Sequence, residues 1–200
     1  LVNLWGFGID LKAFAQPEDS KIQDLLSQVG YKNFKLSEQN LEIKKMIPDL
    51  YLDLSAIAIG SAVDQISLLL EEQGINNYLV EIGGEIKLKG QNLDENLWRI
   101  AIEKPVVTDR AIQKVLNISN AAMATSGDYR NYFEENGVRY SHTIDPRTGY
   151  PITHNLASIT VVSDSAMIAD GFATAIMVLG AEKGYKMAKQ NKIAALFIIK

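Results

Sequence analysis

The sequence predicts an α+β protein with largely antiparallel sheets flanked by helices, and three observations lead to this fold class. Many short apolar or alternating stretches follow one another directly, separated by turn residues, as is typical of antiparallel strands. A few long apolar stretches have the period of helices, but they do not alternate with strands as in a doubly wound parallel sheet. The 200 residues, 47% of them hydrophobic, suffice for one complete core or an intimate pair of subdomains. We therefore predict a single domain over residues 1–200.

Composition excludes several classes of protein. The formal net charge is −4 and Lys and Arg are scattered, so we expect no nucleic-acid partner. No apolar run approaches the length of a membrane span. The absence of cysteine excludes disulfides, thiolate metal sites and a Cys nucleophile, and it leaves the compartment open. The chain begins at Leu1 with neither an initiator Met nor a signal peptide, which suggests that an upstream segment is missing.

The first fifty residues have the pattern of a structural region. Residues 17–29 have the apolar period of a helix, with Ile22 and Leu26 on one face, and Gly30 ends it. Residues 31–36 and 41–43 alternate between apolar and polar side chains, which predicts two short strands or one interrupted hairpin.

Residues 50–55 are predicted to form a strand that runs through small residues into a helix, which Gly74 ends. Small residues at this passage let a ligand approach the backbone, and the free N–H groups and positive dipole end of a helix N-terminus favour an anion. Asp53 lies at the mouth of the passage. It is a candidate ligand-binding residue, and an ordinary helix-start carboxylate is an equally good interpretation.

The middle of the chain is rich in predicted strands. Residues 78–82 and 85–90 form an expected antiparallel pair joined by Gly83 and Gly84, a tight turn or bulge that only weakly suggests a phosphate contact. Further strands are predicted at residues 98–103 and 115–119. Thr125 and Ser126 place two hydroxyls beside a glycine, so residues 124–130 are either an anion cradle or an ordinary Ser/Thr turn.

A polar run at residues 141–151, S-H-T-I-D-P-R-T-G-Y-P, follows a predicted hairpin loop. This short segment combines a His, an Asp, an Arg and a turn. Such a composition indicates a rigid loop that carries a functional site rather than a simple connecting loop. A strand at residues 157–162 comes next, and Ser163 or Asp164 is expected to cap the following helix. After Gly180 a last helix precedes a strand at residues 194–199.

Asp170 and Thr174 interrupt the apolar helix before Gly180 with two oxygen-bearing side chains on one face, a single turn apart. An ionised carboxylate in apolar surroundings needs a cation, a cluster of N–H donors or a shifted pKa. Because the ligands on offer are hard oxygens and Cys is absent, Mg²⁺ or Ca²⁺ is favoured over Zn²⁺. The alternative is that Asp170 faces solvent near the helix start and Thr174 bonds back to a backbone carbonyl.

Five ordered motifs together resemble one family. They are D-L-S-A-I-A-x-G-x-A-V-D at residues 53–64, L-V-x-I-G-G at 79–84, A-T-S-G-D-Y-R at 124–130, S-H-x-I-D-P-R-T-G-x-P at 141–151 and A-D-x-x-A-T-A-x-x-V-L-G at 169–180. The family is that of the FAD:protein FMN transferases, also called flavin transferases and once thought to be thiamine-biosynthesis lipoproteins. The opening L-V-N-L-W-G-F-G resembles it too, so the resemblance covers essentially the whole chain, which corresponds to the C-terminal two thirds of a typical member.

The resemblance implies a flavin-transferase-like, T-fold-related domain that lacks the N-terminal part of the family. It implies an enzyme that binds Mg²⁺ and FAD and transfers FMN to a Thr or Ser hydroxyl of a target protein, with release of AMP. Targets in the family are subunits of redox-driven ion pumps, and members are exported bacterial proteins, often lipid-anchored. We therefore expect a place on the periplasmic side of the inner membrane, with membrane contact only through an anchor that this chain lacks.

The resemblance also implies roles for single residues. The metal ligands would be Asp170, Thr174 and the backbone carbonyl of Ala56. The positions at the flavin nucleotide would be Asp53, Ile59, Gly83, Gly84, Thr125, Ser126 and Ile144. His142 is the candidate to position the diphosphate or to take the hydroxyl proton, because it is one of two His in the chain and lies near Asp145 and Arg147 in sequence. His154 is interpreted as a surface residue.

Two departures from the family pattern leave alternatives open. Ile59 stands where the family usually has a Lys or another polar residue, and Ser61 replaces a common aromatic. A missing cation at position 59 weakens a contact to FAD. The candidate functions are therefore an FMN transferase, an Mg²⁺-dependent FAD pyrophosphatase that uses water in place of the protein hydroxyl, and a non-catalytic flavin-binding module.

Overall fold

The computed structural model describes residues 1–8, 15–106, 111–129 and 131–200. The chain divides into two compact units, and each is described by itself below. The first unit comprises Leu1–Asp53 and Asn131–Thr153, and the second comprises Leu54–Arg130 and His154–Lys200. That the whole chain acts as one catalytic domain stays a prediction.

The first unit consists of one helix, two hairpins and the loop at residues 141–151. Its elements are α1 (Asp19–Leu26), the 3₁₀ turn η1 (Tyr31–Asn33), the hairpin of β1 (Phe34–Ser37) with β2 (Glu42–Lys45), and the hairpin of β8 (Tyr132–Glu135) with β9 (Val138–Ser141). The expected first strand therefore starts three residues later than the alternation suggested, because residues 31–33 turn tightly before the chain extends.

The polar loop at residues 141–151 is fixed to the beginning of the chain through Trp5. The indole of Trp5 is 1% exposed and packs with Ile22 and Ile144, and its Nε1 donates a hydrogen bond of 2.7 Å to the carbonyl of Gly149. Gly149 has a φ of 83°, and a Cβ there would collide with the Ile22 side chain. The loop is thus anchored to a core that forms beneath it, and its rigidity stays a prediction.

The second unit is built on a five-stranded sheet with the order β11-β10-β7-β4-β3. Its strands are β3 (Tyr78–Ile82), β4 (Glu85–Lys89), β7 (Ala121–Gly127), β10 (Leu156–Ser163) and β11 (Ala194–Ile199). Every pairing is antiparallel, which confirms the predicted fold class. Gly83 and Gly84, with φ values of 65° and 112°, form the predicted tight turn between β3 and β4.

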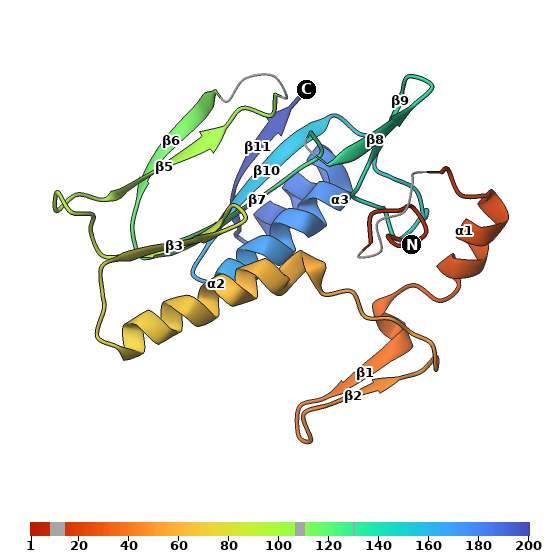
Figure 1. Cartoon of the computed structure of the whole chain (residues 1–200), viewed down its shortest axis with the longest axis horizontal. Helices are drawn as coiled ribbons and strands as arrows, with labels where there is room; N and C mark the ends of the chain where they lie inside the picture. The colour runs from red at the N-terminus through yellow and green to blue at the C-terminus, as the bar shows by residue number, and fades with distance from the viewer. Residues whose placement is uncertain (9–14, 107–110, 130) are drawn as a thin grey trace. The chain divides into compact units, whose positions relative to one another are not determined.

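Helices cover one face of this sheet and a hairpin covers the other (Figure 1). On β7, Ala122 packs with residues of α2 (Ser55–Glu72) and α3 (Ala166–Gln190), whereas Met123 packs with β5 (Trp98–Glu103), which pairs with β6 (Ile112–Ile118). This alternation follows from the pleat, in which successive side chains point to opposite faces. The sheet is therefore buried on both sides.

Several predicted boundaries were wrong. The segment before α2 is not a strand, and α2 begins directly at Ser55. Residues 124–127 are not a turn, because they continue strand β7. The cap of α3 is Ser165, whose Oγ accepts from the N–H of Ile168 at 3.2 Å, rather than either of the two preceding residues. The predicted break at Gly180 is present, where a φ of 78° and a ψ of 176° interrupt α3.

The two helices cross closely at Gly60. A Cβ on Gly60 would lie 2.6 Å from the carbonyl carbon of Ala166 and 2.7 Å from the Cα of Met167, both backbone atoms of α3. Glycine usually weakens a helix interior relative to alanine, by about 1 kcal/mol. Here its missing side chain is what allows the backbones of α2 and α3 to meet.

We expect Gly60→Ala to destabilise the fold although it raises helix propensity. Overpacking against backbone costs roughly 1–3 kcal/mol, which exceeds the propensity gain. Urea denaturation measures the change in the free energy of unfolding. Gly171→Ala on α3 is the matched control, since its Cβ would meet only a methyl of Ile57 at 3.1 Å. Equal stabilisation of both variants would mean that the crossing can relax.

Candidate functional site

Asp170 is the centre of the candidate site because it is a carboxylate buried in the crossing of α2 and α3. It is 7% exposed, and its Oδ2 accepts a hydrogen bond of 3.1 Å from the backbone N–H of Gly60. Burial raises the pKa of Asp170 above its ordinary value, and the bond from Gly60 lowers it only in part. Asp170 does not face solvent, so the alternative interpretation from the sequence, an Asp170 exposed near the helix start, is wrong.

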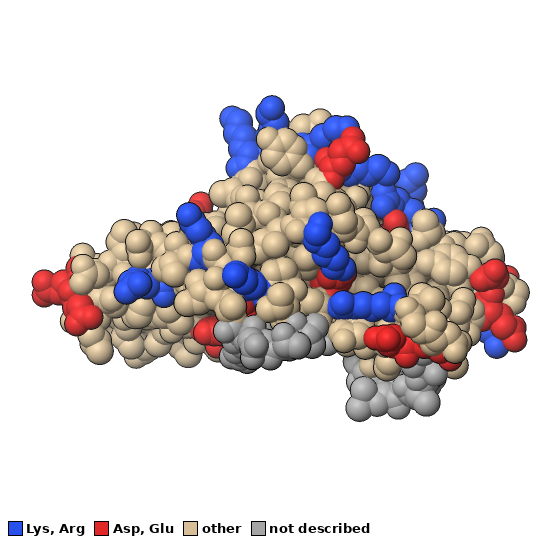
Figure 2. Space-filling view, turned by 90° about the horizontal axis from the view of Figure 1, so that it is seen from above, with Lys and Arg blue, Asp and Glu red and all other residues tan. Residues whose placement is uncertain are grey.

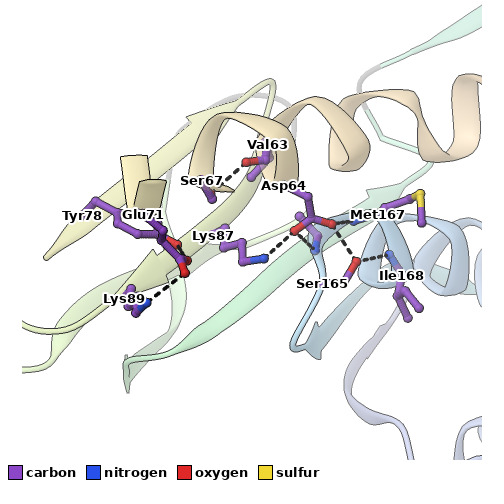
Figure 3. A network of polar contacts seen from close by, with 11 residues as sticks. Val63, Asp64, Ser67, Glu71, Tyr78, Lys87, Lys89, Ser165, Met167 and Ile168 are labelled. Carbon is purple, nitrogen blue, oxygen red and sulfur yellow. Dashed lines mark hydrogen bonds and ion pairs between the residues drawn. The ribbon is translucent and has the colours of Figure 1, made fainter. Parts of the chain in front are cut away.

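Asp64 holds the start of α3 against α2, one turn beyond Gly60 (Figure 3). Its two carboxylate oxygens accept from the backbone N–H groups of Ala166 and Met167, each at 3.0 Å, and from the Oγ of Ser165 at 2.6 Å. The ammonium of Lys87 on β4 pairs with it at 2.8 Å. Asp64 therefore satisfies the unpaired N–H groups of a helix N-terminus from a neighbouring helix, and it fixes where Asp170 is placed one turn later.

We expect Asp64→Asn to lower the free energy of unfolding by about 1–2 kcal/mol at neutral pH, through weakened charge-assisted hydrogen bonds. Burial by itself would raise the pKa of Asp64, but the hydrogen bonds from Lys87, Ser165 and the two N–H groups outweigh it, and the pKa is lowered. A lowered folded-state pKa means that the stabilisation is complete above the unfolded-state pKa and is lost as the pH falls through the folded-state pKa.

The difference between wild type and Asp64→Asn should therefore be largest near neutral pH and should close in acid. Urea denaturation at a series of pH values measures it. Glu182→Gln is the control, since it removes an exposed carboxylate that pairs with Lys186 on the surface of α3. A gap that is independent of pH would show that the ionised form of Asp64 is not what caps the helix.

Thr174 lies one turn after Asp170 on α3, and its Oγ1 is 3.5 Å from the Oγ of Ser126 on β7. Thr125, the neighbour of Ser126, points to the opposite face of the sheet, where its Oγ1 is 2.8 Å from that of Thr160. The two hydroxyls thus do not form one cradle. Only Ser126 is near α3, and Arg130, at the end of the same motif, lies outside the described residues.

Ile59 and the Gly83–Gly84 turn lie beside each other. A Cβ placed on Gly83 would be 3.5 Å from the Cδ1 of Ile59, and Ile59 itself is 40% exposed. The same point is 3.3 Å from the Oε2 of Glu85, the first residue of β4. Glu85 was not predicted from the sequence, because it alternates in phase with Lys87 and Lys89 as if all three faced solvent.

The donor set around Asp170 fits a hard divalent cation. It combines a buried carboxylate with a threonine hydroxyl one helical turn away, and oxygen atoms of this kind are ligands that Mg²⁺ prefers. Ala56 lies on α2 four residues before Gly60, whose N–H bonds to Asp170, and the Ala56 carbonyl stays a predicted ligand. In the described part of the chain, no three His, Cys, Asp or Glu side chains gather to hold a metal by themselves.

In the first unit, Ile144 is buried at 8% exposure in the cluster around Trp5, so its side chain is a core residue and only its backbone is available to a ligand. Asp53 is exposed and precedes α2 by two residues. The N-cap residue of that helix is Leu54. The nucleotide contacts assigned to Ile144 and Asp53 stay predictions.

The two histidines differ in which ring nitrogen carries the proton. His142 lies next to Phe7, and its Nδ1 is 2.8 Å from the carbonyl of Asn131, so Nδ1 carries the proton and Nε2 has the lone pair. His154 has both nitrogens engaged, with Nε2 donating to the carbonyl of Met177 at 2.7 Å and Nδ1 accepting from the N–H of Leu156 at 3.3 Å. His154 is thus half-buried and structural, which corrects its interpretation as a surface residue.

On the face shown in Figure 2, Lys and Arg side chains gather at the upper edge of the view and lie apart among uncharged residues elsewhere. Within the described ranges, no helix combines the length and the apolar character that a membrane crossing requires. The expected absence of a nucleic-acid partner stays a prediction.

Comparisons with known proteins agree with the sequence motifs. The chain matches the model of the ApbE family over residues 1–197. It is 50% identical over 200 residues to the FAD:protein FMN transferase of Vibrio cholerae, and 46% identical over 203 residues to that of Haemophilus influenzae. The solved flavin transferase ApbE from Vibrio cholerae superposes with a TM-score of 0.89 at 47% identity, with all of this chain and 62% of that chain covered.

The α+β fold with its buried carboxylate at a helix crossing is therefore the fold of a flavin-transferase-like protein. The chain belongs to the ApbE family. It spans 59% of the length of both curated relatives, and all 200 residues lie within the match to the first of them.

Proposed function

We propose that the chain is the catalytic part of an Mg²⁺-dependent transferase that moves FMN from FAD to a Thr or Ser hydroxyl of a target protein and releases AMP. The observation that carries this proposal is the buried Asp170 carboxylate, which has one backbone donor and lies a helical turn from Thr174. The relatives named FAD:protein FMN transferase, identical to this chain at up to half of its positions, support the choice of reaction.

The reaction is a phosphoryl transfer in which a phosphoester bond replaces the phosphoanhydride bond of FAD. The acceptor hydroxyl oxygen attacks the phosphorus of the FMN half of FAD and forms a new P–O bond, while the P–O bond to AMP breaks and AMP leaves with the electron pair. When bound, Mg²⁺ supplies neutralisation of the charge on the diphosphate. Asp170 and Thr174, with the Ala56 carbonyl, would hold that ion.

The proton of the acceptor hydroxyl needs a base. His142 suits this role because its Nδ1–H is committed to the Asn131 carbonyl, which leaves Nε2 as the nitrogen that can accept a proton. The ring is therefore held in the tautomer that general-base catalysis requires. His154 cannot take this role in its present position, since both of its nitrogens are hydrogen-bonded.

A pyrophosphatase and a non-catalytic flavin-binding module are the alternatives, and one experiment separates all three functions. The chain is incubated with FAD, Mg²⁺ and a flavin-acceptor domain, and the products are read by in-gel flavin fluorescence and by AMP release. Covalent flavin on the acceptor domain supports the transferase. AMP without labelling supports the pyrophosphatase, in which water replaces the protein hydroxyl. Neither product supports the binding module.

The proposal includes a target and a location. The target is a subunit of a redox-driven ion pump or a similar flavinylated protein, and the location is the periplasmic side of a bacterial inner membrane, with attachment through a lipid anchor. Fractionation of cells that express the complete protein, with and without a membrane-impermeant protease, tests the location. Protection of the protein in intact spheroplasts would contradict it.

We expect Ile59→Lys to strengthen FAD binding by roughly 1 kcal/mol, or about fivefold, at low salt. The half-exposed Ile59 lies beside the Gly83 turn near the start of α2, where an ammonium would attract the diphosphate. Titration with FAD at low and moderate salt measures the gain, which salt should reduce. Unchanged FAD affinity together with higher stability would instead mean that the ammonium pairs with Glu85.

A further inference from the structure

Glu85 is a buried carboxylate that the proposed roles above do not use. It is 9% exposed, and its Oε2 is inaccessible to solvent and accepts no hydrogen bond from the described residues. A buried carboxylate oxygen without a partner costs more free energy than one that remains in water. Some group that is not part of the described chain is therefore expected to satisfy it.

The position of Glu85 points to what that group is. Its Oε2 and the side chain of Ile59 both lie next to Gly83, and the residue after Ile59 is Gly60, which donates to Asp170. Helix α3 packs on β4, the strand that Glu85 begins. Burial raises the pKa of the Glu85 carboxyl, and the negative charge of Asp170 raises it further. Two buried carboxylates that repel each other stabilise the folded state only with a cation or a shared proton.

We propose that Glu85 is a second acidic group for the divalent cation at Asp170, bonding to the ion directly or through one of its bound waters. Mg²⁺ in proteins takes one or two carboxylates and keeps several waters, so this pair supplies the expected charge. The inference rests on the proposed metal site and deepens it by adding a residue on β4 that none of the assigned ligands includes. Because Glu85 follows the Gly83–Gly84 turn directly, that turn would position an acidic ligand as well as offer backbone to a nucleotide.

The test measures metal affinity without FAD, so it does not depend on catalysis. Mn²⁺, which takes oxygen ligands as Mg²⁺ does, is titrated into the protein, and the free ion is counted by its electron paramagnetic resonance, with Mg²⁺ as competitor. Glu85→Gln is the informative variant, because the amide has the shape of a protonated carboxyl and no charge. We expect it to weaken Mn²⁺ binding by about tenfold or more.

Glu81→Gln is the matched control. Glu81 lies on β3 opposite Ile86 and is exposed, so its substitution removes the same charge from the same hairpin and leaves both buried carboxylates in place. We expect its Mn²⁺ affinity to stay within about twofold of wild type, since an exposed charge is screened. If Glu85→Gln also stays within that range, Glu85 is a protonated structural residue and the inference is wrong.

Asp170→Asn in the same titration separates failure of this inference from failure of the proposed function. Loss of binding in Asp170→Asn with unchanged binding in Glu85→Gln overturns only the role of Glu85. Wild-type binding in Asp170→Asn overturns the metal site itself. If Glu85→Gln does not fold, Glu85→Asp is tested instead, because it keeps the charge but shortens the side chain by one methylene. A folded Glu85→Asp protein that binds Mn²⁺ as tightly as wild type would contradict the inference.

Discussion

Asp170→Asn is expected to abolish flavin transfer and to remove the effect of Mg²⁺ on FAD binding. The amide keeps the volume of the side chain but loses the charge that attracts the cation. In wild type, Mg²⁺ and FAD should each raise the affinity of the other by the same factor, because the coupling between two ligands is reciprocal. Calorimetry of FAD binding with and without Mg²⁺ measures that factor, which should fall to one in Asp170→Asn.

The same substitution should leave the metal-free fold intact. The pKa of Asp170 is raised in the folded state, so ionising the side chain at neutral pH works against folding, and this cost is present at any pH above the folded-state pKa. Replacement by Asn removes the cost, and we expect equal or higher stability in urea without metal. Asp164→Asn is the control, an exposed Asp just before the same helix. An equal enhancement of FAD binding by Mg²⁺ in wild type and in Asp170→Asn would place the metal elsewhere.

The burial of Asp170 shows what the periodicity of the sequence predicts and what it cannot predict. The apolar helix around Asp170 and Thr174 predicted that both oxygens share one face, and they do. Helix α2 covers that face because Gly60, more than a hundred residues earlier in the chain, has no side chain and lets the two helices meet. A contact of such sequence separation leaves no periodic pattern in the helix itself, so the site could be located but not assembled from the sequence.

Strand β4 was predicted correctly as an element, but its pattern did not show which of its side chains are buried. Its alternation predicted the strand and its pairing, and both are confirmed. The same alternation puts Glu85, Lys87 and Lys89 on one face, and charged residues usually face solvent. Helices cover that face instead, so Lys87 and Lys89 pair with carboxylates of α2, and Glu85 is buried. Alternation identifies which residues share a face but not what packs on it.

Thr125 and Ser126 show a third limit of predicting structure from the sequence. Their small hydroxyls and the following glycine are typical of turns, and the sequence favoured no strand there. In the structure, pairing with β10 on one side and β4 on the other makes β7 a central strand, and its small residues let α3 pack close to the sheet. Tertiary packing thus overrode local preference, as it commonly does for strands.

His142→Ala is expected to lower the rate of flavin transfer by about 100-fold while FAD affinity changes little. A group that accepts a proton in the transition state contributes to kcat and not to ground-state binding. The fixed Nδ1–H bond to Asn131 gives the physical basis, since it leaves Nε2 with its lone pair. Single-turnover labelling of an acceptor domain measures the rate, and FAD titration by fluorescence measures the affinity.

Two variants make the result for His142 specific. His154→Ala removes the other imidazole, whose two nitrogens bond within the second unit, so it should lower stability and leave the transfer rate per folded molecule unchanged. His142→Gln keeps a donor near the Asn131 carbonyl but offers no basic nitrogen, so it should be as slow as His142→Ala. Transfer by His142→Gln within about threefold of wild type, well below the roughly 100-fold of acid–base groups, would mean that His142 only positions the loop.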